Sequence, residues 1–280
     1  MRLGGEIKQG YSDPIDWMNK VKDMNYSTVY TPIDSSADAD TVKAYKEAAA
    51  KLGVSIGEVG IWRNCLDLDP ESKKKNTEYA IAQLALAEEL EAKCCVNITG
   101  NRGEIWDGFS EANYTDDTYA LIIDSAREII DAVNPKHTFF TLEPMPWMVP
   151  DSPEQYLQLI KDVDREAFGV HLDFVNMINN PKKYVLNEAF IKDCFRLLGP
   201  YIKSIHGKDV IMDNAYTTLI HEVMPGKGIL DYTKILPLVE ALGEDTPFFA
   251  EHLPDEASYR EATSYIRECA KKAGVVIKNV

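Results

Sequence analysis

The sequence has few cysteines and no long apolar run. Its five cysteines are odd in number and show no CxxC spacing, which argues against a disulfide framework and against a metal site built on thiolates. Apolar stretches such as 120–123 and 248–250 fall far short of the roughly 18 to 20 residues that cross a bilayer. The first residues offer no apolar core or cleavage site of a secretory signal. We therefore expect a cytoplasmic protein with buried free thiols and no membrane partner.

Basic residues are also scarce relative to acidic ones. The chain has 30 Lys and Arg against 45 Asp and Glu, a formal net charge of −15, and its only basic cluster is 73–75. Such a surface repels a phosphate backbone, so nucleic acid is excluded as a partner. Apolar residues make up 45% and charged residues 27%, as in a soluble globular protein with a large core. The length of 280 residues suits one α/β-barrel domain spanning 1–280, since such domains hold about 250 residues.

Eight short segments rich in β-branched or aromatic residues alternate with longer segments of helical periodicity. The expected strands are 2–7, 27–31, 54–59, 93–98, 138–143, 169–173, 202–206 and 247–251, and a helix is expected after each. Asp13-Pro14 and Ser152-Pro153 each place a capping side chain before a proline, a helix-start signal. Strict alternation in units of about 35 residues predicts a closed (β/α)8 TIM barrel in a single domain, with a doubly wound open sheet as the alternative.

Four possible metal ligands stand at the ends of four successive expected strands. They are Glu143, Asp173, His206 and Glu251, separated by 30, 33 and 45 residues. A closed barrel would bring them to its C-terminal rim, where barrel active sites lie. Three carboxylates and one imidazole suit Mn²⁺, Co²⁺ or Mg²⁺ better than a structural zinc. Without a cation, three carboxylates buried side by side would cost several kcal/mol. The pattern predicts a divalent-metal site, most consistent with Mn²⁺, and therefore an enzyme.

Other polar and aromatic residues fall near the same rim. His171 precedes Asp173 by two residues and would lie one layer deeper, either orienting a metal ligand or as an ordinary core histidine. Glu58, Trp62, Trp147, Asn176, Lys208 and His221 are candidate substrate-binding residues. Rings could pack on the apolar face of a sugar while polar groups bind its hydroxyls. Lys208 has the alternative of an ion pair with a rim carboxylate, and His221 that of a solvated loop residue. The turn 225–228 lacks the Walker spacing and is read as loop geometry.

With these residues in place, the chain resembles the xylose isomerase-like TIM-barrel superfamily, often called sugar phosphate isomerases/epimerases. The resemblance covers nearly the whole chain and is sharpest in five short segments. They are 142–144, 172–176, 206–209, 225–232 and Glu251. In the ketose 3-epimerases of this superfamily, the positions matching Glu143, Asp173, His206 and Glu251 hold a divalent ion, usually Mn²⁺. Those matching Glu143 and Glu251 also form the acid/base pair.

The resemblance implies a metal-dependent sugar isomerase or epimerase acting on a keto-sugar or sugar phosphate. Glu143 would remove a proton beside the carbonyl, the metal would stabilise the enediolate, and Glu251 would return a proton on the other face. Three departures put the substrate in question. Asn176, Met212 and Val149 stand where the ketose epimerases carry histidine, arginine and glutamate.

Several alternatives therefore stay open. A lyase of the same superfamily, dehydrating inososes or cleaving 3-keto-glycosides, would begin with the same proton removal. A non-catalytic sugar- or metal-binding protein would bind without exchanging that proton. A phosphodiesterase resembling endonuclease IV is disfavoured, because no histidine precedes His137. The sequence leaves the oligomeric state open, a homo-oligomer included.

Overall fold

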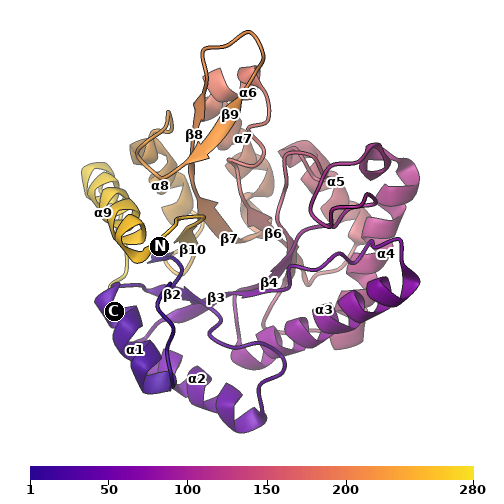
Figure 1. Cartoon of the computed structure of the whole chain (residues 1–280). Helices are drawn as coiled ribbons and strands as arrows, with labels where there is room; N and C mark the ends of the chain where they lie inside the picture. The colour runs from indigo at the N-terminus through magenta and orange to yellow at the C-terminus, as the bar shows by residue number, and fades with distance from the viewer.

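A computed structural model of residues 1–280 confirms the (β/α)8 barrel (Figure 1). Eight parallel strands run in the order β1-β10-β7-β6-β5-β4-β3-β2. Their bounds are β1 Arg2–Gly4, β2 Thr28–Tyr30, β3 Ser55–Gly60, β4 Cys94–Asn97, β5 Phe140–Leu142, β6 Phe168–Leu172, β7 Ile202–Gly207 and β10 Pro247–Ala250. The Ser27 amide donates to the Leu3 carbonyl at 2.9 Å, which brings the chain before β2 beside β1 and nearly closes the ring.

Helices cover the outside of the strands (Figure 1). Their bounds are α1 Pro14–Asp23, α2 Ala39–Leu52, α3 Pro70–Leu90, α4 Asp116–Val133, α5 Pro153–Val163, α6 Pro181–Val185, α7 Asn187–Leu198, α8 Tyr232–Glu240 and α9 Glu256–Ala273. The two predicted starts are confirmed: Asp13 accepts from the amides of Ile15 and Asp16, and Ser152 accepts from that of Gln155. No helix combines the length and apolarity needed to cross a membrane.

The structure departs from the expected strand–helix alternation in two places. Two helices follow β6, because Asn180 caps the short α6, which begins at Pro181, and the chain leaves helical geometry at Leu186 before α7. After β7 the chain forms an antiparallel hairpin, β8 Asp209–Met212 with β9 Ile220–Val223, before reaching α8. In Figure 1 this hairpin projects away from the ring of strands.

The ring of Phe249 fills part of the barrel interior. Phe249 stacks on Tyr30 with ring centroids 4.2 Å apart. A β-carbon on Gly4 or on Gly57 would lie 2.8 or 2.6 Å from atoms of the Phe249 ring, so both strands need glycine there. Gly57 also lies at a register shift, since Val29 pairs with Ile56 while Tyr30 pairs with Glu58. A bulge of this kind re-aims a side chain, and here Glu58 is buried beneath the rim.

Candidate metal and catalytic centre

The four predicted ligands meet at the C-terminal ends of their strands. One ligand atom from each of Glu143, Asp173, His206 and Glu251 lies within 4.8 Å of the others. His206 Nδ1 is 3.2 Å from Glu143 Oε1, 2.9 Å from Glu251 Oε2 and 3.9 Å from Asp173 Oδ2. All four side chains are buried or nearly so. The structure thus brings together donors from four separate strands around one small volume.

The barrel architecture explains why these side chains converge. Glu143, Asp173 and Glu251 each follow immediately after the last residue of β5, β6 and β10, while His206 is the penultimate residue of β7. Parallel strands end at the same rim, and alternate residues point into the barrel. His206 is also paired in register with Phe249 of β10, two residues before Glu251. The predicted site therefore depends on strand-end position rather than on any local sequence motif.

A lysine lies among the carboxylates. The Nζ of Lys208 is 2.8 Å from Asp173 Oδ2, 2.7 Å from Glu251 Oε2 and 3.8 Å from Glu143 Oε1. Its side chain is fully buried and is not part of the pocket wall. Lys208 therefore forms the ion pair that was one of its two predicted roles. It is placed to balance charge beneath the site.

The residues present fit a divalent cation. Glu143, Asp173 and Glu251 together with Glu58 supply more negative charge than Lys208 and a protonated His206 can balance. Asp173 Oδ2, Glu251 Oε2 and Lys208 Nζ are buried without a partner in hydrogen-bond geometry, despite their close approach. Buried polar atoms of this kind need an explanation, and an ion is one. Carboxylate oxygens and one imidazole match the preferences of Mg²⁺ and Mn²⁺.

The far side of the His206 ring meets a second carboxylate. His206 Nε2 lies 3.4 Å from Glu58 Oε2 and 3.4 Å from the Tyr30 hydroxyl. Ser204 donates a hydrogen bond to Glu58 Oε1, and His171 Nδ1 lies 3.4 Å from the same oxygen. A carboxylate at Nε2 favours the tautomer that carries the proton there, which would leave the Nδ1 lone pair available to a bound metal. Glu58, predicted as a substrate contact, lines the pocket and is also placed to orient His206.

His171 lies one layer below the ligands, as its sequence position predicts. It is fully buried, and its ring centroid is 4.0 Å from that of His206. Neither ring nitrogen has a hydrogen-bond partner. Burial lowers the pKa of His171 to about 4, so the ring is neutral at pH 7. It packs against His206 and Glu58, next to the ligands rather than among them.

The two carboxyl groups predicted for acid/base chemistry have opposite pKa shifts. Burial, followed by the negative charge of Glu251, raises the pKa of Glu143 to about 7. Burial also opposes ionisation of Glu251, but the neighbouring positive charges of His206 and Lys208 hold its pKa well below the usual range. Lys208 likewise keeps the pKa of Asp173 low against the effect of burial. Pairs whose environments separate their pKa values are typical of acid/base catalysis.

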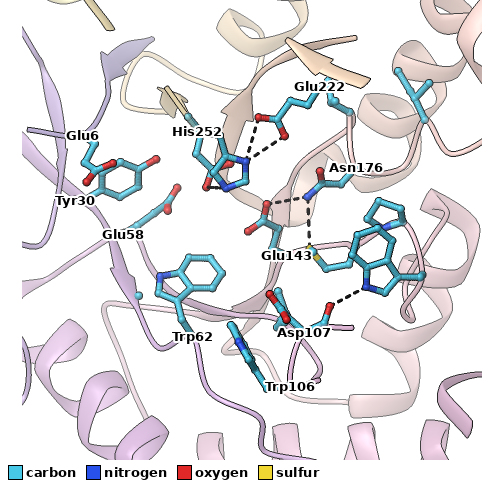
Figure 2. Close-up of a pocket in the computed structure, with 18 of the residues that line it drawn as sticks. Glu6, Tyr30, Glu58, Trp62, Trp106, Asp107, Glu143, Asn176, Glu222 and His252 are labelled. Atoms are coloured by element: carbon cyan, nitrogen blue, oxygen red, sulfur yellow. Dashed lines mark hydrogen bonds and ion pairs between the residues drawn. The ribbon is translucent and has the colours of Figure 1, made fainter. Parts of the chain in front are cut away.

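The centre opens into one large pocket (Figure 2), with a cavity of about 1120 Å³. Trp62, Trp147 and Asn176, all predicted as substrate contacts, line it. Asn176 Nδ2 donates to Glu143 Oε1 at 3.1 Å. His221 does not line the pocket; it lies on β9 and its Nε2 is 3.0 Å from Asp213 Oδ2. Alternation along the strand turns His221 away from the pocket, whereas its neighbour Glu222 lines it.

Several residues of the pocket wall escaped the sequence analysis, among them Glu222, His252 and Trp106. Glu222, on the unpredicted hairpin, lies 3.4 Å from Lys208 Nζ and 3.1 Å from His252 Nδ1. Figure 2 shows Glu222 and His252 on one side of Glu143 and Trp106 on the other. Trp106 belongs to the irregular segment between β4 and α4, where no periodicity marks it. Residues 220–223, which carry Glu222, are short, show no apolar/polar alternation and are half-exposed or exposed, so the sequence offered no clear strand signal there.

Comparison of the sequence with models of known protein families agrees with this architecture. The model described as "Xylose isomerase-like TIM barrel" matches residues 12–269. The chain belongs to this family. Solved structures of low sequence identity share the fold of this chain, with TM-scores near 0.7. A 3-keto-D-glucoside 4-epimerase from E. coli is 16% identical, covering 96% of this chain and 100% of that one, with TM-score 0.70. No curated protein gives a significant match.

Two further solved structures are similar to this chain. D-psicose 3-epimerase from Clostridium cellulolyticum H10, in a structure with D-tagatose, is 14% identical, with 98% of each chain covered and TM-score 0.68. A xylose isomerase-like TIM barrel protein from Mycobacterium smegmatis, in complex with magnesium, is 18% identical, covering 94% of this chain and 90% of that one, with TM-score 0.68. At these identities the likeness establishes the fold, and the chemistry has to be argued from the site.

Proposed function

We propose that this protein is a divalent-metal-dependent sugar epimerase or isomerase that moves a proton on carbon beside a ketone. The observation that carries the proposal is the pair Glu143 and Glu251. Their carboxylates approach His206 Nδ1 to 3.2 and 2.9 Å and both line the pocket. They arrive from β5 and β10, which are separated in the sheet by β6 and β7. A substrate carbon held between them would be open to proton transfer on two faces.

The chain's own residues can account for the proton movements. The ionised member of the pair removes the proton beside the ketone, and the protonated member delivers one to the opposite face. Delivery to the same carbon gives an epimer, and delivery to the neighbouring carbon gives the aldose or ketose isomer. Asn176 holds Glu143 Oε1 in place at 3.1 Å, and Lys208 holds Glu251 Oε2 at 2.7 Å. Because the reaction is reversible, either carboxyl group serves as base in one direction.

Glu143, Asp173, His206 and Glu251 are the residues that would hold the metal. A bound divalent cation would draw electron density from the carbonyl oxygen and so make the adjacent C–H bond more acidic. Mg²⁺ and Mn²⁺ both suit the donor set. The magnesium complex of the M. smegmatis structure and the epimerase names of two other similar structures support the same proposal.

Deuterium uptake tests this function. Metal-stripped protein, reloaded with Mg²⁺ or Mn²⁺, is incubated in D₂O with ketoses and 3-keto-glycosides, and the products are followed by NMR. We expect deuterium at the carbon beside the ketone together with a stereoisomer or isomer. Glu143→Gln and Glu251→Gln should each slow uptake about 10²–10⁴-fold, the usual contribution of a positioned acid or base. The matched control Glu47→Gln, on the exposed face of α2, should leave it unchanged.

The same experiment separates the alternatives. Uptake that persists in both Glu143→Gln and Glu251→Gln would remove the pair from the mechanism. Elimination products without stereoisomers would identify a lyase, which shares the proton-removal step. Sugar binding without any deuterium uptake would identify a non-catalytic binding protein.

A further inference from the structure

The wall of the pocket carries seven carboxylates and one histidine, His252, but no lysine or arginine. Besides Glu58, Glu143 and Glu251, the acidic residues Glu6, Asp34, Asp107 and Glu222 line it, whereas no lysine or arginine does. Phosphate groups are held in proteins by Arg, Lys or free backbone amides. A phosphorylated ligand would bring about −1.5 to −2 units of charge at pH 7 into a cavity of the same sign. The side chains of the wall therefore disfavour a sugar phosphate.

The backbone amides that could replace a basic side chain are already occupied. TIM barrels often bind phosphate in the loops after the seventh and eighth strands. After β7, the amides of Gly226 and Gly228 donate to Asp209 Oδ2, each at 3.0 Å, and that of Leu230 donates to Asp209 Oδ1 at 3.0 Å. After β10, the first turn of α9 is capped by Asp255. An internal carboxylate thus fills each place where a phosphate would be expected.

The other side of the pocket is aromatic. Trp62, Trp106 and Trp147 line it and come from the loops after β3, β4 and β5. The Trp147 indole donates to the Asp107 carbonyl at 2.8 Å, which ties the last two loops together. Trp106 and Trp147 remain 40% and 36% exposed. Figure 2 shows Trp62 and Trp106 away from Glu222 and His252, with Glu143 between the two groups. Indole faces exposed in this way suit the apolar face of a sugar ring.

The cavity is larger than a single sugar needs. A hexose has about 12 non-hydrogen atoms, and allowing each of them the roughly 30 Å³ that a whole water molecule occupies in the liquid gives an upper bound of about 360 Å³. The cavity measures about 1120 Å³. A two-ring ligand of about 23 non-hydrogen atoms would take about 690 Å³ by the same measure. The space beyond the reacting ring is therefore sufficient for a second ring, and the indoles bound that space.

We propose that the substrate is an unphosphorylated keto-sugar that carries a second ring, as in a disaccharide or another glycoside. The ketone-bearing ring lies at Glu143 and Glu251, and the second ring packs on Trp62, Trp106 and Trp147. This inference rests on the proposed function for the identity of the reacting ring. The absence of a phosphate and the presence of a second ring are inferred from the residues and the volume of the pocket alone.

Binding is tested with three alditols that contain no ketone and so cannot react. Sorbitol, sorbitol 6-phosphate and 6-O-glucosyl-sorbitol differ only in the group on one oxygen. Tryptophan fluorescence of the Mg²⁺-loaded protein reports their dissociation constants. We expect the glucosyl compound to bind at least 10-fold more tightly than sorbitol, and the phosphate at least 10-fold more weakly than the glucosyl compound. The proposal would be overturned if sorbitol 6-phosphate bound as tightly as 6-O-glucosyl-sorbitol. It would also be overturned if 6-O-glucosyl-sorbitol bound no more tightly than sorbitol, or if neither compound bound.

A pair of aromatic variants locates the second ring. Trp106→Ala should weaken binding of 6-O-glucosyl-sorbitol at least 10-fold and that of sorbitol less than 2-fold. Phe109→Ala is the matched control, because Phe109 lies in the same segment, is 79% exposed and does not line the pocket. Equal losses for the two ligands in Trp106→Ala would contradict the assignment of this subsite.

Turnover with the corresponding ketoses separates the two proposals. Fructose, fructose 6-phosphate and 6-O-glucosyl-fructose are supplied in D₂O to the wild-type protein. If the alditols bind as expected and none of the ketoses takes up deuterium, the substrate class stands and the proposed function fails. If fructose 6-phosphate takes up deuterium fastest, the function stands and the substrate class fails.

Discussion

Replacing Lys208 by methionine should destabilise the metal-free protein and tighten its binding of a divalent cation. The ammonium lies 2.8 Å from Asp173 Oδ2 and 2.7 Å from Glu251 Oε2, and the side chain is fully buried. Removing one partner of a buried ion pair costs about 3–5 kcal/mol, a large fraction of the roughly 5–15 kcal/mol stability of a typical domain. Methionine keeps the length and apolar stem, so the effect is one of charge.

The effect on cation affinity has the opposite sign. Two unit charges about 4 Å apart repel by about 4 kcal/mol at an effective dielectric constant of 20. Relief of even a third of that repulsion, about 1.4 kcal/mol, tightens binding tenfold. We therefore expect Lys208→Met to bind Mg²⁺ or Mn²⁺ at least tenfold more tightly than the wild type does. Part of the lost stability should return when the cation is present.

Urea denaturation in EDTA and in excess Mg²⁺, combined with calorimetric titration of the metal, measures both effects. Lys227→Met is the matched control, since the Lys227 side chain is 57% exposed in its pair with Glu261, and such pairs contribute at most about 1 kcal/mol. A Lys208→Met variant with wild-type stability in EDTA and unchanged cation affinity would refute the reasoning. That result would mean that the Lys208 ammonium does not pair with the carboxylate oxygens that would bind the cation.

Three further substitutions test the orientation of the imidazole, the loop after β7 and the tie between the chain ends. Glu58→Gln should weaken metal affinity about 10–100-fold, as loss of a carboxylate behind a ligating histidine does, and unchanged calorimetric affinity would remove Glu58 from its role at His206. Gly228→Ala should lower the free energy of unfolding by about 1–3 kcal/mol, because its β-carbon would overlap Asp209; Gly10→Ala, with nothing within 4 Å, should lack this effect in the same denaturation assay. Hydrogen bonds from Lys278 and from the arginine of β1 lower the pKa of Asp245 to about 2. The ionised Asp245 therefore stabilises the fold above the unfolded-state pKa of about 4, and this stabilisation is lost as the pH falls towards 2. Asp245→Asn should therefore cost less than about 1 kcal/mol at pH 7, given the exposure of the pair, and nothing near pH 2 in thermal denaturation; an equal cost at both pH values would contradict the assigned ion pair.

Much of the centre could be predicted from the sequence because it depends on strand ends. Once the barrel is recognised, a residue that ends a strand must lie at the rim, which is why Glu143, Asp173, His206 and Glu251 were found without any local motif. The same two-residue alternation places His171 one layer below Asp173. These inferences need only the period of the strands and the number of repeats.

Features that depend on irregular backbone could not be predicted. The role of Glu58 follows from the register shift at Gly57, and a bulge leaves no periodic signal in the sequence. The hairpin that carries Glu222 has short strands with half-exposed or exposed side chains at most positions, so its hydrophobic alternation is weak. Trp106 lies in a segment whose path is fixed by tertiary contacts. Position in space, rather than residue type, decides which of these side chains meet the ligand.

The central claim is that Glu143, Asp173, His206 and Glu251 jointly hold one divalent cation. Calorimetric titration of metal-stripped protein with Mn²⁺ tests it most directly, beside Asp173→Ala, with circular dichroism to confirm the fold, and Asp34→Asn as a control on the pocket wall. We predict one site per chain in the wild type and in Asp34→Asn, and at least 100-fold weaker binding in Asp173→Ala. No saturable binding to the wild type, or equal affinity in a folded Asp173→Ala variant, would contradict the account.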